Sequence, residues 1–254
     1  MTATGRELLE DATGHPVATF LRGDRDGFPL ADDVQPEGGA GAEQIADAIE
    51  RELRGHIIGG SRELGELLVQ RGAVARRRST LMECEPAAVR SHVPPRPPAG
   101  VTIEPAAGRT PDDVLDAYID AYPEAHPDHH AGLDRDGQRE MLRALMAGEV
   151  IGPLLGCSRV ARAGDGYVGA SLVFDPAGEP PLGVPWVGEL FRHPDAPRGV
   201  GASLLAATLD QARDDGLAVI GLRVSDGNPA RALYDRLGFR PRQEVVTVFV
   251  PEAP

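Results

Sequence analysis

Hydrophobic residues at two different spacings divide the second half of the chain into strands and helices. Leu204, Leu205 and Leu209 recur at helical spacing directly after a glycine-containing turn. A short extended run, residues 187–191, precedes that turn, and a second one, residues 217–224, follows the helix. This order of strand, glycine turn, helix and strand predicts an α/β domain.

The same pattern predicts elements on both sides of this unit. We expect a strand at 101–105, helices at 112–122 and 136–145, a hairpin of 158–163 with 167–174, a loop at 175–185, a strand from Trp186, and a short helix at 228–238. The hairpin turn, Gly164-Asp165-Gly166, is the strongest short turn signal in the chain.

The first 90 residues predict a smaller set of elements. They are a helix or arm at 1–14, a strand at 15–21, a long loop at 23–41, a helix with Ile45, Ala48, Ile49 and Leu53 on one face, a strand at 56–58, a helix at 63–71 and a strand at 73–84. Residues 67–76 align with residues 233–242, with Gly72 in register with Gly238 and Leu68 in the place of Tyr234. An internal repeat is the interpretation, and chance similarity of two helix-glycine-strand units is the alternative.

The turn before the long helix carries Gly199 and Gly201. With little side chain around them, consecutive amide N–H groups can face one point at a helix N-terminus, and such a nest binds anionic oxygens. A tight turn that only packs the helix is the alternative. A dinucleotide-binding fold would place its glycines by the first strand, and a phosphate-binding Walker loop needs a lysine, whereas all 26 basic residues here are arginines.

Two groups of residues together carry a specific resemblance. They are Arg198, Gly199, Val200, Gly201, Ala202, Leu204 and Leu205, and then Asn228, Ala230, Leu233, Tyr234, Gly238 and Phe239. They resemble the two acyl-CoA-binding motifs of the GNAT superfamily of N-acyltransferases. The resemblance implies a mixed sheet that splays open at a bulge in the strand holding Glu189 to Arg192, with pantetheine in the split and the pyrophosphate on amides of 198–203. One departure is Ala196, where the family usually has Gln or Arg.

The resemblance also implies the domain organisation. The fold class is α/β, an α+β mixed sheet: a catalytic GNAT domain at 101–254 with splayed central strands. A Pro-rich linker at 91–100 precedes it. If the repeat is real, residues 1–90 are a truncated, non-catalytic GNAT-like domain that binds no CoA, a layout similar to that of tandem GNAT proteins.

The implied activity is acetyl transfer from acetyl-CoA to a primary amine of a small molecule or peptide, by direct attack in a ternary complex. This reaction needs a base and an acid. Glu189 is the predicted base, because partial desolvation beside the split would raise its pKa; an ion pair with an arginine, or exposure to solvent, is the alternative. Tyr234 is the predicted acid, in the place where the family has one, and packing in the core is its alternative.

The resemblance assigns a set of cofactor-binding residues. They are Phe191, Arg192, Arg198, Gly199, Val200, Gly201, Ala202, Ser203, Asn228, Ala230 and Tyr234. Backbone N–H near Phe191 or Arg192 could also bind the oxyanion. Asn228 is expected to hold pantetheine amides, or else to cap the following helix.

A histidine-rich segment, residues 123–133, lies in the region that the resemblance assigns to the acceptor-binding lid. It holds His126, His129 and His130 with Glu124 and Asp128. Two interpretations of this segment stay open: its side chains orient the acceptor amine, or it is a solvated polar loop. A metal site is a third alternative, but the segment has no recognisable ligand motif. We therefore predict no metal.

Composition and charge limit the kinds of partner that the protein is expected to bind. The net charge of −13 argues against nucleic acid and favours approach of a cationic amine. The chain has no apolar run of about 18 residues and no signal-like start, so no membrane and a cytoplasmic location are expected. Cys84 and Cys157 are expected to be free thiols. A non-catalytic acyl-CoA-binding or partner-binding protein is the alternative function, and a monomer and a homodimer are both open.

Overall fold

The computed structural model describes residues 5–25, 27–89, 96–130 and 132–252. The chain divides into two compact units, Met1–Leu81 with Pro241–Pro254, and Met82–Arg240. Part of the predicted linker 91–100 lies outside the described residues, which begin again at residue 96. The functional boundaries at 90 and 101 stay a prediction, and the last strand belongs to the first unit.

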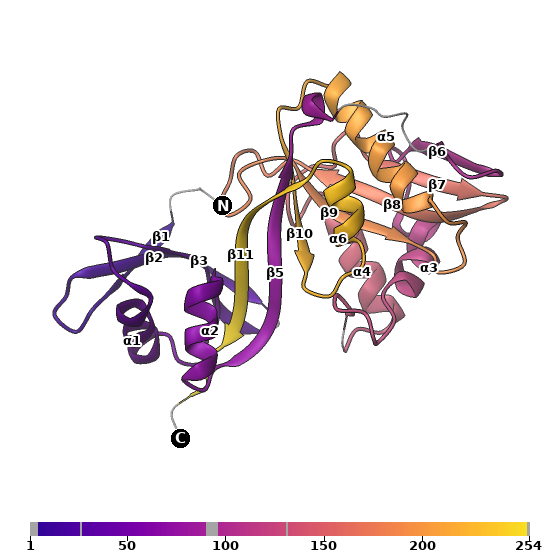
Figure 1. The fold of residues 1–254 in the computed structure, drawn as a ribbon. Helices are drawn as coiled ribbons and strands as arrows, with labels where there is room; N and C mark the ends of the chain where they lie inside the picture. The colour runs from indigo at the N-terminus through magenta and orange to yellow at the C-terminus, as the bar shows by residue number, and fades with distance from the viewer. Residues whose placement is uncertain (1–4, 26, 90–95, 131, 253–254) are drawn as a thin grey trace. The chain divides into compact units, whose positions relative to one another are not determined.

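The first unit is a mixed sheet packed against helices (Figure 1). Its elements are β1 (Arg6–Glu10), β2 (Pro16–Arg25), β3 (Phe28–Pro36), α1 (Ala42–Glu52), β4 (Ile57–Ser61), α2 (Arg62–Gln70), β5 (Val74–Cys84) and β11 (Arg240–Phe249). The strand order is β1-β2-β3-β4-β11-β5, in which β3 and β4 are parallel and β4 and β11 antiparallel.

The core of the first unit joins one face of α1 to the sheet. Ile45 and Ile49 of α1, which are one helical turn apart, are both buried in it. Val246 of β11 lies so close to α2 that a Cβ on Gly65 would be 2.4 Å from its side chain. A glycine in α2 is therefore what lets this helix approach β11.

Two predictions for the first unit are wrong. Residues 6–10 form β1 rather than a helix or arm, and the expected loop 23–41 contains β3. The Asp and Pro residues of β3 are typical of loops, but here Asp33 has a tertiary partner. Arg6 donates to Thr19 Oγ1 at 2.9 Å and to Asp33 Oδ2 at 2.7 Å, which offsets the cost of acidic residues in a strand.

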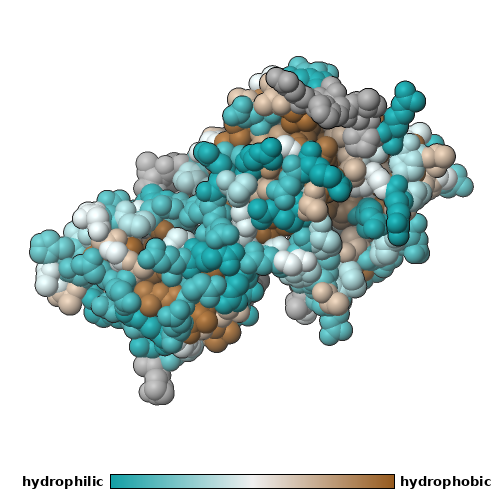
Figure 2. Space-filling model, viewed as in Figure 1, coloured by the Kyte–Doolittle hydropathy of each residue, from teal (hydrophilic) through white to brown (hydrophobic). Residues whose placement is uncertain are grey.

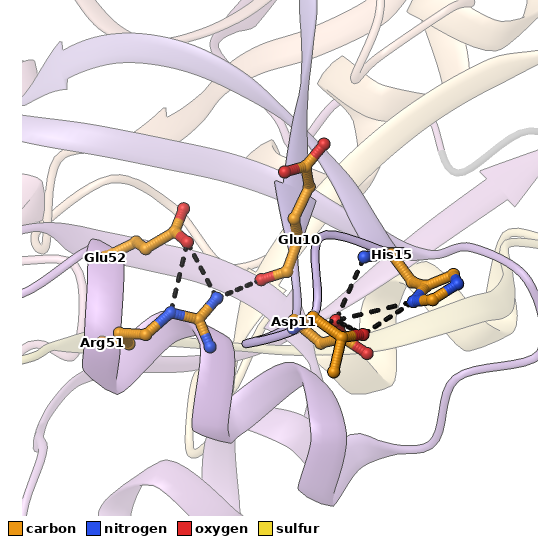
Figure 3. A network of polar contacts seen from close by, with 6 residues as sticks. Glu10, Asp11, His15, Arg51 and Glu52 are labelled. Carbon is orange, nitrogen blue, oxygen red and sulfur yellow. Dashed lines mark hydrogen bonds and ion pairs between the residues drawn. The ribbon is translucent and has the colours of Figure 1, made fainter.

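A polar network fixes the turn between β1 and β2 (Figure 3). Asp11 Oδ1 accepts hydrogen bonds from the Thr13 hydroxyl at 2.6 Å, from the Thr13 amide at 2.8 Å and from the His15 amide at 3.0 Å. Arg51 of α1 donates to the Glu10 carbonyl and to Glu52. The first two strands are thus tied to α1 by polar contacts as well as by the core.

The second unit contains the predicted elements in the predicted order. They are β6 (Val101–Pro105), α3 (Pro111–Ala121), α4 (Arg135–Met146), β7 (Arg159–Ala163), β8 (Gly166–Phe174), β9 (Trp186–Arg192), α5 (Val200–Asp214), β10 (Ile220–Ser225) and α6 (Arg231–Arg236), after a 3-10 turn at Pro86–Ala88. Strand order is β10-β9-β8-β7-β6; β9 and β10 are parallel and the other neighbours antiparallel. A mixed α/β sheet, the predicted fold class, is confirmed.

Alternating residues of β8 separate the two faces of this sheet. Val173 packs in a cluster with Leu205 of α5, whereas Leu172 and Phe174 pack with Tyr118 of α3. Helices α5 and α6 therefore cover one face and α3 and α4 the other, as strand periodicity requires.

The repeat is visible in the ends of α2 and α6. In α2, the amides of Gly72 and Ala73 donate to the carbonyls of Val69 and Leu68, at 3.0 and 2.9 Å. In α6, Gly238 and Phe239 donate to Asp235 and Tyr234 in the same pattern, at 3.3 and 3.0 Å. Both glycines have positive φ, 106° and 94°, as this helix ending requires. The aligned residues thus fold alike.

The visible surface is mainly hydrophilic, with smaller hydrophobic areas between the hydrophilic residues (Figure 2). Among the described residues, none of the helices has the length and apolar composition needed to cross a membrane.

Candidate active site

The glycine turn between β9 and α5 leaves room at the start of the helix. Gly199 has a φ of 99°, which favours glycine, and the Ser203 amide donates to its carbonyl at 2.9 Å. Among the described residues, a Cβ on Gly201 would have only Leu233 Cδ2 within 4 Å, at 3.9 Å. The backbone at the α5 N-terminus can therefore be approached closely by a ligand.

Two polar side chains at this turn lack partners among the described residues. Arg198 is exposed and makes no hydrogen bond or ion pair with them. The hydroxyl of Ser203 is buried and forms no hydrogen bond with them either. A phosphate at the helix N-terminus would meet the first amides of α5 and pair with the exposed Arg198, whereas the Ser203 hydroxyl is buried away from any ligand that approaches there. Arg198 and the amides of the turn fit the pyrophosphate of an acyl-CoA.

Packing explains why the chain has Ala196 at the position where the family usually has Gln or Arg. Ala196 is buried in a cluster with Val200 and Leu204, and its amide donates to the His193 carbonyl at 3.0 Å. A long polar side chain would have to leave this cluster. The phosphate contact that the family makes from this position is absent, and Arg198 is the cation at the turn.

The strands β9 and β10 part at a bulge, as expected from the resemblance. Val187 faces Val173 and Glu189 faces Leu172, so Gly188 is an extra residue in β9. A Cβ on Gly188 would lie 2.8 Å from the Phe174 ring. Pairing of β9 with β10 is confined to Gly221 with Trp186 and Leu222 with Val187. The backbone of β9 beyond the bulge is thus free of its ladder with β10.

Glu189 lies immediately after the bulge and is half-buried. The hydroxyl of Tyr122, at the end of α3, donates to Glu189 Oε2 at 2.7 Å. Burial, and then the negative charge of Glu189, raise the pKa of Tyr122 well above its ordinary value. Tyr122 therefore remains a proton donor to the carboxylate, and its contact with Glu189 was not foreseen from the sequence.

Tyr234, on α6, has a buried ring and an unbonded hydroxyl. The ring packs near Phe239, with centroids 5.9 Å apart, and the hydroxyl makes no hydrogen bond with any described residue. Burial, followed by the charges of Asp128 and Glu189, raises the pKa of Tyr234. The core packing that was its alternative is present, and it leaves a protonated hydroxyl available as a donor.

Asn228 lies two residues before the N-cap of α6, Ala230, and makes a second contact that the sequence did not indicate. Its Oδ1 accepts from the Ala230 amide at 2.8 Å, and its Nδ2 donates to Asp128 Oδ2 at 2.9 Å. The Ala230 amide is therefore already bonded. Contacts of Asn228 and Ala230 with pantetheine stay a prediction.

The side chains of Phe191 and Arg192, two predicted cofactor-binding residues, are occupied by contacts within the protein. The Phe191 ring is buried beside Tyr118, with centroids 5.2 Å apart. Arg192 donates to the carbonyls of His193 and Pro194, at 3.1 and 2.9 Å. Only their backbone groups remain candidates for the oxyanion.

The three histidines of residues 123–133 have separate partners. His126 Nδ1 accepts from the Asp128 amide, His129 Nδ1 bonds the Tyr122 carbonyl at 2.8 Å, and His130 Nε2 bonds the Tyr118 hydroxyl at 2.9 Å. In the part of the chain that the structure describes, no group of three or more His, Cys, Asp or Glu residues could hold a metal ion. These contacts fix the segment on α3.

Sequence reasoning missed a second G-x-G pattern, Gly39-Ala40-Gly41, in front of α1, although the pattern itself was the signal. Gly39 has a φ of 79°. The Gly41 amide donates to Gln44 Oε1 at 3.1 Å and the Ala40 amide to the Glu37 carbonyl at 2.9 Å. The amides of this turn are therefore bonded within the chain.

The split also has no open counterpart in the first unit. β3 and β4 pair at three positions, from Leu30 with Ile57 to Val34 with Gly60. Asp32 Oδ1 lies 2.0 Å from the place of a Cβ on Gly59. Leu68, in the place of Tyr234, is buried in the core.

Comparison with known proteins places this site in a family. The model of the Acetyltransferase (GNAT) family matches residues 112–239, from the start of α3 to the end of the α6 cap. No curated protein matches significantly. The matched range contains the glycine turn, the bulge, Glu189 and Tyr234.

Solved structures share the fold over almost the whole chain. A GCN5-related N-acetyltransferase from Sphaerobacter thermophilus has a TM-score of 0.63 at 17% identity, covering 97% of this chain and 81% of its own. One from Kribbella flavida has 0.58 at 20% identity, covering 98% and 90%. A tandem GNAT protein from the clavulanic acid biosynthesis pathway has 0.59 at 17% identity, covering 96% and 82%. The chain has a tandem GNAT-like structure and belongs to the GNAT acetyltransferase family.

Proposed function

We propose that this protein transfers an acetyl group from acetyl-CoA to a primary amine of a small molecule or peptide, by direct attack in a ternary complex. The observation that carries the proposal is the free, protonated hydroxyl of Tyr234 on α6, with Glu189 just beyond the β9 bulge. They provide a proton acceptor on one of the parted strands, β9, and a proton donor on α6, the helix that follows the other.

The chain's own groups suit the binding of acetyl-CoA. The amides at the start of α5 and the Arg198 guanidinium would hold the pyrophosphate. Bound acetyl-CoA supplies a thioester carbonyl and a thiol leaving group. The backbone N–H groups of β9 near Phe191 and Arg192 would bind the thioester oxygen as it gains negative charge.

The proton transfers then balance. Glu189 accepts the proton that the attacking amine loses, directly or through water, and Tyr234 donates a proton to the sulfur that leaves. A nitrogen–carbon bond forms and the carbon–sulfur bond breaks. Tyr122 donates to Glu189 Oε2 at 2.7 Å, and this contact would help to hold the carboxylate in place.

The electrostatics favour a cationic acceptor. Besides the net charge of −13, the carboxylates of Asp128 and Glu189 both act on Tyr234. An ammonium group would be attracted to this region and would lose its proton to the base on arrival. A cytoplasmic location and a monomeric or homodimeric state stay predictions.

The test is release of free CoA from acetyl-CoA across a panel of amines, amino acids, aminoglycosides and peptides. We expect acceptor-dependent thiol release with at least one amine class and a mass increase of one acetyl group in that amine. Binding of CoA by calorimetry without release for any acceptor would instead support the alternative, a non-catalytic acyl-CoA-binding or partner-binding protein.

A further inference from the structure

Asp128 joins the segment between α3 and α4 to the end of β10. Its Oδ1 accepts from the Ser225 hydroxyl at 2.5 Å, and its Oδ2 accepts from Asn228 Nδ2 at 2.9 Å. These partners are 97 and 100 residues further along the chain. The carboxylate therefore holds the predicted acceptor-side segment against the connection that leads to α6.

The same contact orients the Asn228 side chain. A carboxylate only accepts hydrogen bonds, so it requires the NH₂ side of the amide. The oxygen of that amide then points to the Ala230 amide, which it accepts at 2.8 Å at the start of α6. If the Asn228 side chain rotated, it would lose both bonds. Asp128 thus acts on the residues that lead into the helix that carries Tyr234.

Asp128 also acts on Tyr234 through its charge. After burial, the charge of Asp128 is the largest cause of the raised pKa of Tyr234, ahead of Glu189. A negative charge beside the phenol disfavours the phenolate and so keeps the hydroxyl protonated.

We infer that Asp128 is a positioning residue that couples the acceptor-side segment to α6, so that the segment and the Tyr234 hydroxyl take their working places together. This inference rests on the proposed function for its kinetic consequences. Its structural part, the coupling of residues 122–130 to residues 226–236, can be measured without turnover.

The decisive experiment exchanges the two partners. D128N replaces a carboxylate, which accepts from both partners, by an amide with a single acceptor oxygen, so Ser225 and Asn228 can no longer each donate to an oxygen of their own. The double variant D128N/N228D reverses the pair: the amide at 128 donates, and the carboxylate introduced at 228 accepts from it and from the Ala230 amide. Asp116→Asn is the matched control, since the exposed Asp116 pairs only across α3 and α4, with Arg135 at 2.6 Å.

We expect D128N to lower kcat, and kcat/KM for the acceptor, by about tenfold to a hundredfold, with the Kd for CoA changed less than about threefold. The double variant should recover most of the loss, and Asp116→Asn should match the parent. Unchanged kinetics in D128N, or a double variant as slow as the single one, would overturn the inference.

Hydrogen exchange separates this inference from the proposed function. D128N should speed amide exchange in both 122–130 and 226–236, and the double variant should restore both. If the parent transfers no acetyl group, the proposed function fails, yet the exchange result still decides the coupling. Faster exchange in one segment alone, with the other unchanged, would contradict it.

Discussion

The Tyr122 hydroxyl donates to Glu189 Oε2 at 2.7 Å, across 67 residues of sequence. Tyr122 ends α3 and Glu189 follows the β9 bulge, so the bond connects the acceptor-side helix to the parted strand. Burial and Glu189 raise the pKa of Tyr122 well above its usual value, so its hydroxyl stays protonated and can donate this bond. The bond fixes one oxygen of the Glu189 carboxylate.

Replacing Tyr122 by phenylalanine should weaken both the fold and the reaction. The Glu189 carboxylate would lose a hydrogen-bond donor in a half-buried place, which costs about 1–3 kcal/mol of unfolding free energy. Since the carboxylate would lose a contact that orients it, we expect kcat to fall about tenfold. Urea unfolding and the thiol-release assay measure the two effects.

Tyr167→Phe is the matched control for that variant. The Tyr167 hydroxyl makes only a long contact, 3.5 Å, with Glu104 Oε2, so its loss should change neither quantity appreciably. Equal kinetics for Tyr122→Phe and Tyr167→Phe would show that the Tyr122 bond has no part in the reaction.

Tyr234→Phe should separate binding from turnover. Its hydroxyl bonds to no described residue, so removing it leaves the fold without an unsatisfied partner. We expect normal CoA affinity and stability, with turnover reduced about a hundredfold or more through loss of the general acid. Thiol release at the parental rate would exclude the assigned role.

Gly201→Val tests the glycine turn. The space beside Gly201 is open, since a Cβ would have only Leu233 Cδ2 within 4 Å, so the fold should accept a side chain there. The same side chain would occupy the proposed pyrophosphate position, and we expect CoA affinity to fall at least about tenfold with an essentially unchanged Tm. Calorimetry and thermal unfolding give the two numbers.

Ala207→Val, later in α5, controls for valine in this helix. Ala207 is only half-buried, and it lies outside the turn. This variant should bind CoA normally. Normal affinity in Gly201→Val as well would contradict the assignment of the turn to the pyrophosphate.

Asp11 gives a prediction for low pH. The Thr13 hydroxyl, followed by the His15 and Thr13 amides, lowers the pKa of Asp11 to about 2 from 3.8. Because the folded pKa is the lower one, its stabilising effect is complete above 3.8 and disappears as the pH falls toward 2. An NMR titration should show this low midpoint, and Thr13→Val, which removes the largest cause, should raise it. An unchanged midpoint in Thr13→Val would refute the assignment.

Local signals in the sequence were sufficient to predict most helices and strands of the second unit. Gly199 and Gly238 could be placed because a positive φ is a property of a few consecutive residues, and the periodicity of α5 followed from its own side chains. The repeat was found for the same reason, since the cap at Gly72 needs only its neighbours.

Contacts between distant residues could not be found in this way. Tyr122 has no local feature that points to Glu189, and Asp128 reads as one more polar loop residue until β10 brings Ser225 beside it. The strand β3 was taken for a loop because Arg6, which binds Asp33, lies 27 residues earlier. The glycine pair at Gly39 was visible in the sequence, but its internally bonded amides were not.

The last strand gives a prediction about dissection of the chain. β11 pairs with β4, from Val245 with Ser61 to Phe249 with Ile57, and Val246 and Val248 are fully buried in the first unit's core. A fragment of residues 101–254 would expose them, at a cost of about 1.5–3 kcal/mol per side chain, and would lack Met82 and Cys84 from the core of the second unit.

We expect this fragment to unfold without a cooperative transition when made alone. Coexpressed with residues 1–100, it should copurify with that fragment and regain the transition, because each fragment then supplies what the other lacks. Cooperative unfolding of the isolated 101–254 fragment, with normal CoA binding, would contradict this expectation. It would show instead that residues 101–254 fold as an independent domain, as the sequence predicts.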